Sequence, residues 1–213
     1  MKILAITGPF GSGKTTVTHF AAAALRSAGK GVAIVALDEV SRAVLNESLV
    51  LRHELAEVFG EDILNDDSSL NRTTLAQCAF IDDQSTAKLN ALVHPPMIEH
   101  ARTLLCRAKD CEKIALIESP FPLMYFSELF EGLETKPLIW TVAADKETRL
   151  MRGLADGYSK DDALQRMDRQ PRMSAYQTEA DETVENSDGL EDLHLEVQMY
   201  LAESKLLDAD ACP

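Results

Sequence analysis

The sequence has few cysteines, and their spacing suits neither a disulfide framework nor a zinc site. The chain of 213 residues has four cysteines, with no Cys-x-x-Cys pair and no histidine at a zinc-binding spacing. Free thiols of this kind are typical of a protein in a reducing compartment. The four residues are Cys78, Cys106, Cys111 and Cys212.

Basic residues are also scarce, and long apolar runs are absent. The 21 Lys and Arg stand against 35 Asp and Glu, which gives a formal net charge of -14. A protein that binds nucleic acid normally has a basic face, so we expect no nucleic-acid partner. No apolar stretch approaches the length of a membrane span, and no signal region precedes the first strand pattern. We expect a cytoplasmic protein with small-molecule partners and no membrane partner, and the oligomeric state stays open.

Against these absences stands one complete motif near the start of the chain. Residues 8–15 read GPFGSGKT, the pattern G-x-x-x-x-G-K-[ST], between the apolar run 3–6 and a helical pattern. Gly11 and Gly13 allow the backbone to turn so that successive N–H groups point at phosphate oxygens, whereas Pro9 has no N–H. We expect Lys14 to contact the β- and γ-phosphates of ATP and the Thr15 hydroxyl to ligate Mg²⁺. The predicted nucleotide-binding residues are Gly8, Pro9, Phe10, Gly11, Ser12, Gly13, Lys14, Thr15 and Thr16.

The rest of the sequence favours an α/β fold with a mostly parallel sheet flanked by helices. Apolar runs at 32–37, 114–117 and 138–143 are typical of parallel strands covered on both faces, and 182–185 is a weaker candidate. The interval from 38 to 113 is too long for one crossover helix, so we expect a lobe of several helices over the strand ends. The residues from 206 to 213 have the pattern of a frayed tail.

Asp38 follows the second predicted strand, at the sheet edge where open α/β folds bind ligands. A carboxylate there can accept the proton of an attacking hydroxyl or help to hold Mg²⁺. Asp is equally favoured as the N-cap of a helix that begins near Glu39. Arg42, one helical turn later, can contact an acceptor phosphate or pair with Asp38. The position alone leaves these alternatives open.

Several further segments, taken in order, resemble the dephospho-CoA kinase family. The resemblance implies one P-loop kinase domain over 1–213, with a helical acceptor-binding lobe at 39–112 and a lid at 149–172. The implied reaction is the ATP-dependent phosphorylation of the 3′-hydroxyl of dephospho-CoA, with Mg²⁺ as cofactor. The segments are ALDEVSRAV at 36–44, FGEDIL at 59–64, LNRTTL at 70–75, LNALVHP at 89–95, DGYS at 156–159 and ADETVEN at 180–186, together with Phe80 and Gln170.

The resemblance also implies roles for single residues. Asp38 matches the family's proposed catalytic base, and Lys14 acts with it in catalysis. Arg72 and His94 match positions in the acceptor-binding lobe, and Asn186 falls in the segment near the nucleotide base. Each of the lobe residues has a plain alternative. Arg72 can be an exposed residue at a helix start, and His94, before two prolines, can hydrogen-bond backbone at a turn.

The chain departs from the family pattern in two places. The family's lid arginine directly before the segment at 156–159 is absent, which leaves Arg149 and Arg152 as the lid candidates. The family's acidic residue in the segment after the third strand is absent at 119–124, and Glu118 and Glu128 are the nearest acids. These departures keep two alternatives open: a kinase for another nucleotide or nucleoside, or a degenerate member that binds ATP without transfer. A guanine-specific switch is disfavoured because residues 144–146 read ADK and lack the Asn of N-K-x-D.

Overall fold

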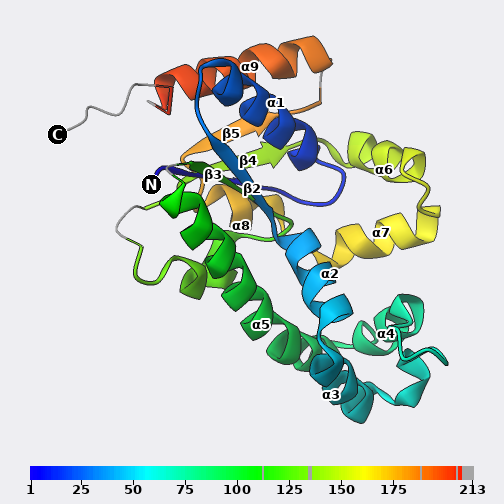
Figure 1. Ribbon diagram of the computed structural model, residues 1–213. Helices are drawn as coiled ribbons and strands as arrows, with labels where there is room; N and C mark the ends of the chain where they lie inside the picture. Colours follow the sequence, from blue (N-terminus) through cyan, green and yellow to red (C-terminus); the bar gives the residue numbers. More distant parts are fainter. Residues whose placement is uncertain (112, 134–135, 188, 205, 208–213) are drawn as a thin grey trace. The chain divides into compact units, whose positions relative to one another are not determined.

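A computed structural model describes residues 1–111, 113–133, 136–187, 189–204 and 206–207. In these residues five strands form one sheet in the order β2-β3-β1-β4-β5, and every neighbouring pair is parallel (Figure 1). The carboxyl ends of the strands therefore meet at one edge, and the predicted α/β class with a parallel sheet is confirmed. The strands are β1 (Ile3–Thr7), β2 (Val32–Ala36), β3 (Ile114–Ser119), β4 (Leu138–Ala143) and β5 (Glu182–Glu185).

Strand β2 differs from its prediction in length and in burial. It ends at Ala36, because Leu37 begins helix α2 (Leu37–Glu47). Strand β2 is the sheet edge, and Ile34 is 37% exposed. The expectation of cover on both faces is therefore wrong for β2, because the Ile34 side chain is exposed. It holds for the central strand β1, in which every residue is buried.

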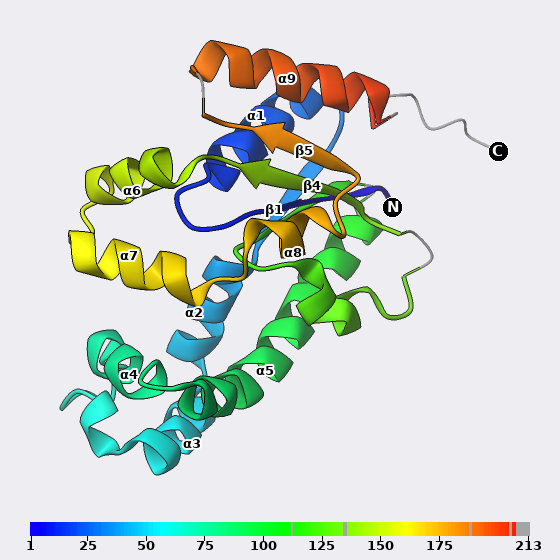
Figure 2. The same cartoon turned by 180° about the vertical axis from the view of Figure 1, so that it is seen from behind.

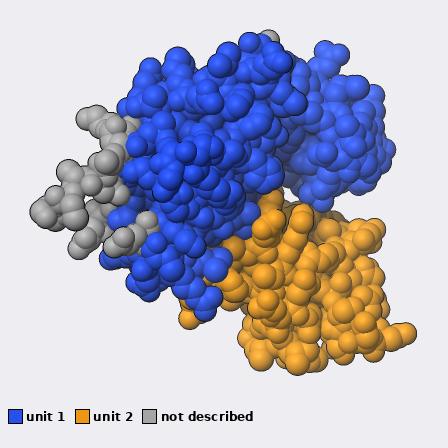
Figure 3. Space-filling view, turned by 45° about the horizontal axis from the view of Figure 1, so that its top comes forward, with its two compact units in different colours: residues 1–36, 104–213 blue, residues 37–103 orange. Residues whose placement is uncertain are grey.

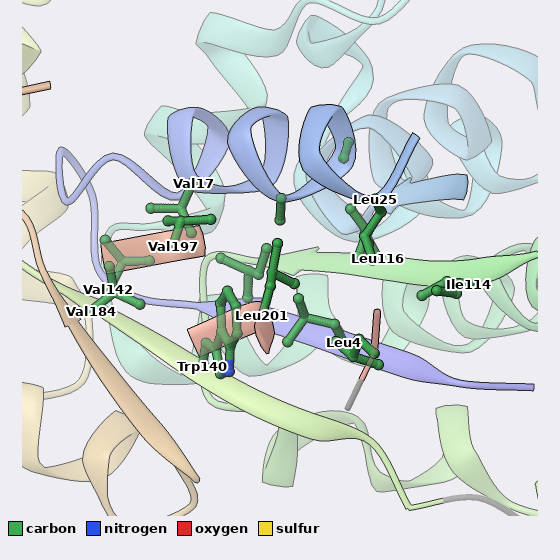
Figure 4. Packing of buried hydrophobic residues seen from close by; sticks show 14 of the residues in the cluster. Leu4, Val17, Leu25, Ile114, Leu116, Trp140, Val142, Val184, Val197 and Leu201 are labelled. Atoms are coloured by element: carbon green, nitrogen blue, oxygen red, sulfur yellow. The ribbon is translucent and has the colours of Figure 1, made fainter. Parts of the chain in front are cut away.

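Helices α1 (Lys14–Ser27) and α9 (Leu190–Glu203) pack together on one face of the sheet (Figures 1 and 2). Figure 4 shows Val17 and Leu25 of α1 and Val197 of α9 against the apolar side chains of the strands. Leu206 is 4% exposed and belongs to the same cluster, so the predicted frayed tail is wrong at that residue. Residues 208–213, including Cys212, lie outside the described part of the chain.

Helix α1 ends at a glycine in the left-handed conformation. Gly29 has φ +76°, and its N–H donates to the Arg26 carbonyl at 3.0 Å. The next N–H, from Lys30, donates to the Leu25 carbonyl at 3.0 Å. This pair of bonds satisfies the last helical carbonyls and needs a residue with positive φ, which glycine adopts at the lowest cost.

The chain divides into two compact units, coloured separately in Figure 3. One unit joins residues 1–36 to residues 104–213, and the other is residues 37–103. The second unit is helical and has its own buried residues, among them Leu55 and Ile63. The predicted lobe of 39–112 extends beyond it, because helix α5 continues from the second unit into the first. The second unit holds α2, α3 (Leu49–Phe59), η1 (Glu61–Ile63), α4 (Arg72–Ala79) and most of α5 (Asp83–Asp110).

The first unit also carries the helices of the predicted lid region. In both views α6 and α7 lie at the end of the sheet where β1 runs into α1 (Figures 1 and 2). No helix among the described residues is long and apolar enough to cross a membrane. The remaining elements of this unit are η2 (Leu123–Phe130), α6 (Lys146–Ala155), α7 (Lys160–Arg169) and α8 (Met173–Gln177).

Candidate active site

The loop between β1 and α1, residues 8–13, has three glycines in the left-handed half of conformational space. The φ angles are +146° at Gly8, +73° at Gly11 and +94° at Gly13. A Cβ at Gly8 would lie 2.6 Å from the Val142 carbonyl oxygen, and one at Gly11 would lie 2.5 Å from that of Arg149. The sequence predicts the turn at Gly11 and Gly13, and the structure adds Gly8. These positions need glycine for their backbone conformation and for space.

Helix α1 begins immediately after the loop, with Gly13 in the N-cap position and Lys14, Thr15 and Thr16 in the first turn. The first N–H groups of a helix have no partner inside it, and they carry the positive end of the helix dipole. No acidic residue in this first turn offsets that charge. The Lys14 ammonium donates to the Pro9 carbonyl at 3.2 Å. The start of α1 therefore offers backbone donors and one ammonium group to an anion.

Thr15 pairs with an acid from a neighbouring strand. Its hydroxyl donates to the Glu118 carboxylate at 2.6 Å. Glu118 lies near the end of β3, in register with Ile6 of β1, so the parallel pairing brings it beside the loop. Hydroxyl and carboxylate oxygens are ligands that suit Mg²⁺. No cluster of three His, Cys, Asp or Glu able to hold a metal occurs in the described chain.

Helix α6 presents both lid candidates to the loop. Arg149 donates from Nε to the Phe10 carbonyl at 2.8 Å. Arg152, one turn later, donates from Nη1 to the carbonyls of Gly11 at 3.3 Å and Ser12 at 3.2 Å. Burial lowers the pKa of the Arg149 guanidinium from its ordinary value. Both arginines therefore contact the phosphate loop through its backbone oxygens.

The start of α6 is fixed by Asp145. Its carboxylate accepts the backbone N–H of Thr148 at 2.8 Å and the Thr148 hydroxyl at 2.6 Å. These bonds lower the pKa of the Asp145 carboxyl below its ordinary value. The cap sets where α6 begins and hence which of its residues face the loop.

Asn186 lies just after β5, with its side chain against the loop rather than exposed. It is 3% exposed, and its backbone N–H donates to the Ala143 carbonyl at 2.8 Å. Its Nδ2 donates to the Ser12 carbonyl at 2.7 Å. Its own carbonyl and Oδ1 accept from Arg152 Nη2 at 2.9 and 3.2 Å. The Ser12 side chain is fully buried, and its hydroxyl has no hydrogen-bond partner among the described residues.

Phe10 joins the loop to the lid region. Its backbone N–H donates to the Gln170 side-chain oxygen at 2.6 Å. Its ring lies edge-on to Tyr158, with centroids 5.1 Å apart, and a Cβ at Gly153 would lie 2.7 Å from the same ring. Arg166 of α7 lies over the other ring, 4.7 Å from the Tyr158 centroid. Two of the segments that carry the family resemblance, at 156–159 and 170, therefore meet the phosphate loop.

The altered segment at 119–124 is also held from the lid side. The Pro120 carbonyl accepts the Tyr176 hydroxyl at 2.8 Å and the Gln170 amide at 3.4 Å. Burial raises the pKa of the Tyr176 phenol. A carboxylate does reach this segment, but it belongs to Glu179, which accepts the backbone N–H of Met124 at 2.8 Å. Glu179 thus places its negative charge at the start of η2.

Comparison with known proteins places the chain in a family. Residues 2–192 match the dephospho-CoA kinase family. The chain belongs to the dephospho-CoA kinase family. The dephospho-CoA kinase of Corynebacterium glutamicum is 34% identical over 203 residues, which cover 94% of this chain and 96% of the relative. Family membership confirms the predicted ATP-dependent phosphotransferase.

Solved structures agree with the fold. A crystal structure from Thermus thermophilus is 32% identical with a TM-score of 0.67, and the match covers 95% of this chain and 97% of the other. The dephospho-CoA kinase from Campylobacter jejuni has a TM-score of 0.65 at 20% identity, over 96% of this chain and 98% of the other. The predicted P-loop kinase fold is therefore confirmed.

The residues that the dephospho-CoA kinase resemblance assigns to the acceptor lie in the unit 37–103. Asp38 is exposed in the first turn of α2, which begins at Leu37, so the alternative of an N-cap at Asp38 is wrong. In the described chain its carboxylate forms neither a hydrogen bond nor the ion pair with Arg42 that the sequence allowed. Arg72 begins α4 and donates to the Asn46 side chain at 3.0 Å and to the Arg42 carbonyl at 3.4 Å.

His94 lies inside α5, which runs on through Pro95 and Pro96. The alternative of a histidine at a turn is therefore wrong.

Sequence reasoning missed Glu118 as the partner of Thr15, and it missed Tyr176 and Glu179 altogether. The signal for Glu118 is its place at a strand end, which becomes informative once β1 and β3 are known to be neighbours. Nothing local marks Tyr176 or Glu179, because their partners lie more than 50 residues away in the chain.

Proposed function

We propose that this chain transfers the γ-phosphoryl group of ATP to the ribose 3′-hydroxyl of dephospho-CoA, which gives coenzyme A. The observation that carries the proposal is the phosphate loop itself, with three glycines at positive φ directly before the first turn of α1. The family match over residues 2–192 supplies the acceptor. The unit 37–103 would bind that acceptor.

On the donor side, the N–H groups at the start of α1 would bind the phosphates, and Lys14 would exchange the Pro9 carbonyl for a phosphate oxygen. Thr15 and Glu118 would hold Mg²⁺, and the 2.6 Å hydrogen bond between their side-chain oxygens supports this role. The ion, when bound, neutralises part of the charge on the β- and γ-phosphates.

On the acceptor side, Asp38 would orient the attacking hydroxyl and accept its proton. Its exposed carboxylate has no competing partner in the described chain, which leaves it available for this role. Arg42, Arg72 and His94 would bind the anionic diphosphate of the acceptor, for which guanidinium groups are well suited. The Arg72 guanidinium donates to the backbone carbonyl of Arg42, so the two residues are neighbours, which supports one shared anion site.

The test is ADP release with Mg²⁺-ATP and a panel of acceptors: dephospho-CoA, adenosine, other nucleosides and nucleoside monophosphates. We expect turnover with dephospho-CoA, and a loss of about 100-fold or more in Asp38→Asn with ATP affinity retained. Arg107→Gln, at an exposed residue of α5, serves as a control. Turnover of another acceptor, with no turnover of dephospho-CoA, would show that the proposed substrate is wrong. ATP binding with no acceptor-dependent release would identify a degenerate kinase instead.

A further inference from the structure

Three successive carbonyl groups of the phosphate loop are held by side chains that come from far along the chain. The Phe10 carbonyl accepts from Arg149 at 2.8 Å, and the Gly11 carbonyl accepts from Arg152 at 3.3 Å. The Ser12 carbonyl accepts from both Arg152 at 3.2 Å and Asn186 at 2.7 Å. These partners lie on α6 and at the end of β5.

This pattern determines which way the loop N–H groups point. In a planar trans peptide the C=O of one residue and the N–H of the next point in opposite directions. Fixing the carbonyls of Phe10 and Ser12 toward α6 and Asn186 therefore turns the N–H groups of Gly11 and Gly13 the other way. Neither N–H has a hydrogen-bond partner among the described residues. The intervening N–H, from Ser12, donates to the Pro9 carbonyl at 3.2 Å.

Arg152 is itself held in place. Its Nη2 donates to the carbonyl and to the side-chain oxygen of Asn186, while its Nη1 donates to the loop. Asn186 packs directly against Gly13, where a Cβ would overlap its Nδ2. A guanidinium with four acceptors and a buried amide beside it has little freedom to turn toward another group.

We propose that Arg152 and Asn186, assisted by Arg149, are positioning residues that orient the peptide groups of the phosphate loop. The inference rests on the proposed function, in that the loop must bind the nucleotide phosphates. It differs from a lid role, in which an arginine contacts the phosphoryl group during transfer. In this arrangement the two α6 arginines act on the loop backbone, and the nucleotide meets the N–H groups of Gly11 and Gly13.

The two roles predict different effects on ADP, which lacks the transferred group. A positioning residue supports every phosphate that the loop binds, so its loss weakens the binding of ADP and of ATP to the same extent. An arginine that stabilises only the transferring phosphoryl group leaves ADP affinity unchanged and lowers kcat. Amide hydrogen exchange of Ser12 in the nucleotide-free protein gives a second readout, which involves no phosphate, because its N–H is hydrogen-bonded to the Pro9 carbonyl within the loop.

The experiment measures ADP and ATP dissociation constants by calorimetry for Arg152→Gln, Asn186→Ala and the double variant. We expect each single change to weaken the binding of ADP and of ATP by about tenfold. The double variant should bind no more weakly than the weaker-binding single variant, because Arg152 and Asn186 hold the same Ser12 carbonyl. Arg152→Lys, which keeps the charge without the planar fork, is expected not to restore affinity. Exchange at Ser12 should accelerate in all four Arg152 and Asn186 variants, because a loop that is no longer held opens the Ser12–Pro9 bond more often.

Two controls separate the outcomes. Arg107→Gln removes the same charge at an exposed position and should change neither affinity nor exchange. Lys14→Ala tests the loop itself: if it left ADP affinity unchanged, the proposed function of the loop would fail. If Lys14→Ala weakens ADP but Arg152→Gln and Asn186→Ala do not, the positioning role is wrong. Unchanged ADP affinity with a large fall in kcat would assign Arg152 to the transferred phosphoryl group instead.

Discussion

The packing of Asn186 on Gly13 makes Gly13→Ala a sharp test of how the loop is supported. Gly13 has φ +94°, and an added Cβ would overlap the Asn186 side-chain amide. The substitution therefore has two separable costs. One is the left-handed backbone conformation, and the other is the displacement of Asn186 from the Ser12 carbonyl.

Both costs can be worked out from the structure. A residue with a Cβ in the left-handed region costs about 1–2 kcal/mol. Displacing Asn186 breaks its 2.7 Å bond to Ser12 and the 3.2 Å bond from Arg152. A hydrogen bond contributes about 1 kcal/mol, and one with a charged partner about 1.5–3 kcal/mol. We expect Gly13→Ala to reduce the free energy of unfolding by about 3.5–6 kcal/mol, the sum of these two costs.

Gly29→Ala is the matched control, measured in the same urea unfolding experiment. Gly29 has φ +76°, and no atom lies within 4 Å of its added Cβ. Gly29→Ala therefore has the backbone cost alone, about 1–2 kcal/mol. Both substitutions replace Gly with Ala, so their effect on the entropy of the unfolded chain is the same. The difference between the two variants, about 2.5–4 kcal/mol, measures the Asn186 contacts.

The cycle with Asn186→Ala gives the refuting result. Once the amide is removed, Gly13→Ala should cost no more than Gly29→Ala, because nothing remains for the Cβ to displace. Equal costs for Gly13→Ala and Gly29→Ala in the otherwise unchanged protein would refute the argument that Asn186 supports the loop.

Three further predictions concern single side chains. Glu118→Gln should raise the Mg²⁺ concentration for half-maximal turnover by about tenfold and leave the KM for the acceptor unchanged. A Mg²⁺ titration of the activity measures this, and a change in the acceptor KM alone would contradict the prediction. Tyr176→Phe removes the 2.8 Å bond to Pro120 and should cost about 1–2 kcal/mol in urea unfolding, whereas no change would show that the bond contributes nothing. The hydrogen bonds from Thr148 lower the pKa of the folded Asp145 carboxyl. The stability that they contribute is fully present at a pH above the ordinary pKa of 3.8, and it is lost as the pH falls through the pKa of the folded state. The melting temperature of Asp145→Asn should therefore lie furthest below that of the unchanged protein near pH 6 and approach it below pH 4; a constant gap would argue against this linkage.

The sequence predicts the sheet well, because a buried parallel strand is a continuous apolar run whatever its partners are. The bounds of β4 and β5 match their predictions, and β2 fails only where its edge position and the start of α2 intervene. His94 shows the limit of local rules. Two prolines after it indicate a turn, yet α5 continues, with Val93 and Met97 buried on either side of the histidine.

The candidate site divides in the same way. The motif at 8–15 is contiguous, so its local chemistry can be read directly from the residues. The pairing of Thr15 with Glu118 depends on strand register, and the contacts of Arg152 with the loop depend on which face of α6 meets it. Neither the pairing nor these contacts can be read from one segment of the sequence. The sequence therefore identifies Arg152 as a candidate but does not show that it contacts the loop carbonyls.

The bond from Asn186 to Ser12 joins residues 174 positions apart, and it has a consequence for synthesis on the ribosome. The phosphate loop emerges long before Asn186, which is one of its supports. Until β5 has left the exit tunnel and paired with β4, the Ser12 carbonyl lacks this partner. Such distant contacts form late, because they must wait for chain closure. A nascent chain stopped before residue 186 should therefore bind nucleotide weakly, although it already contains the whole motif.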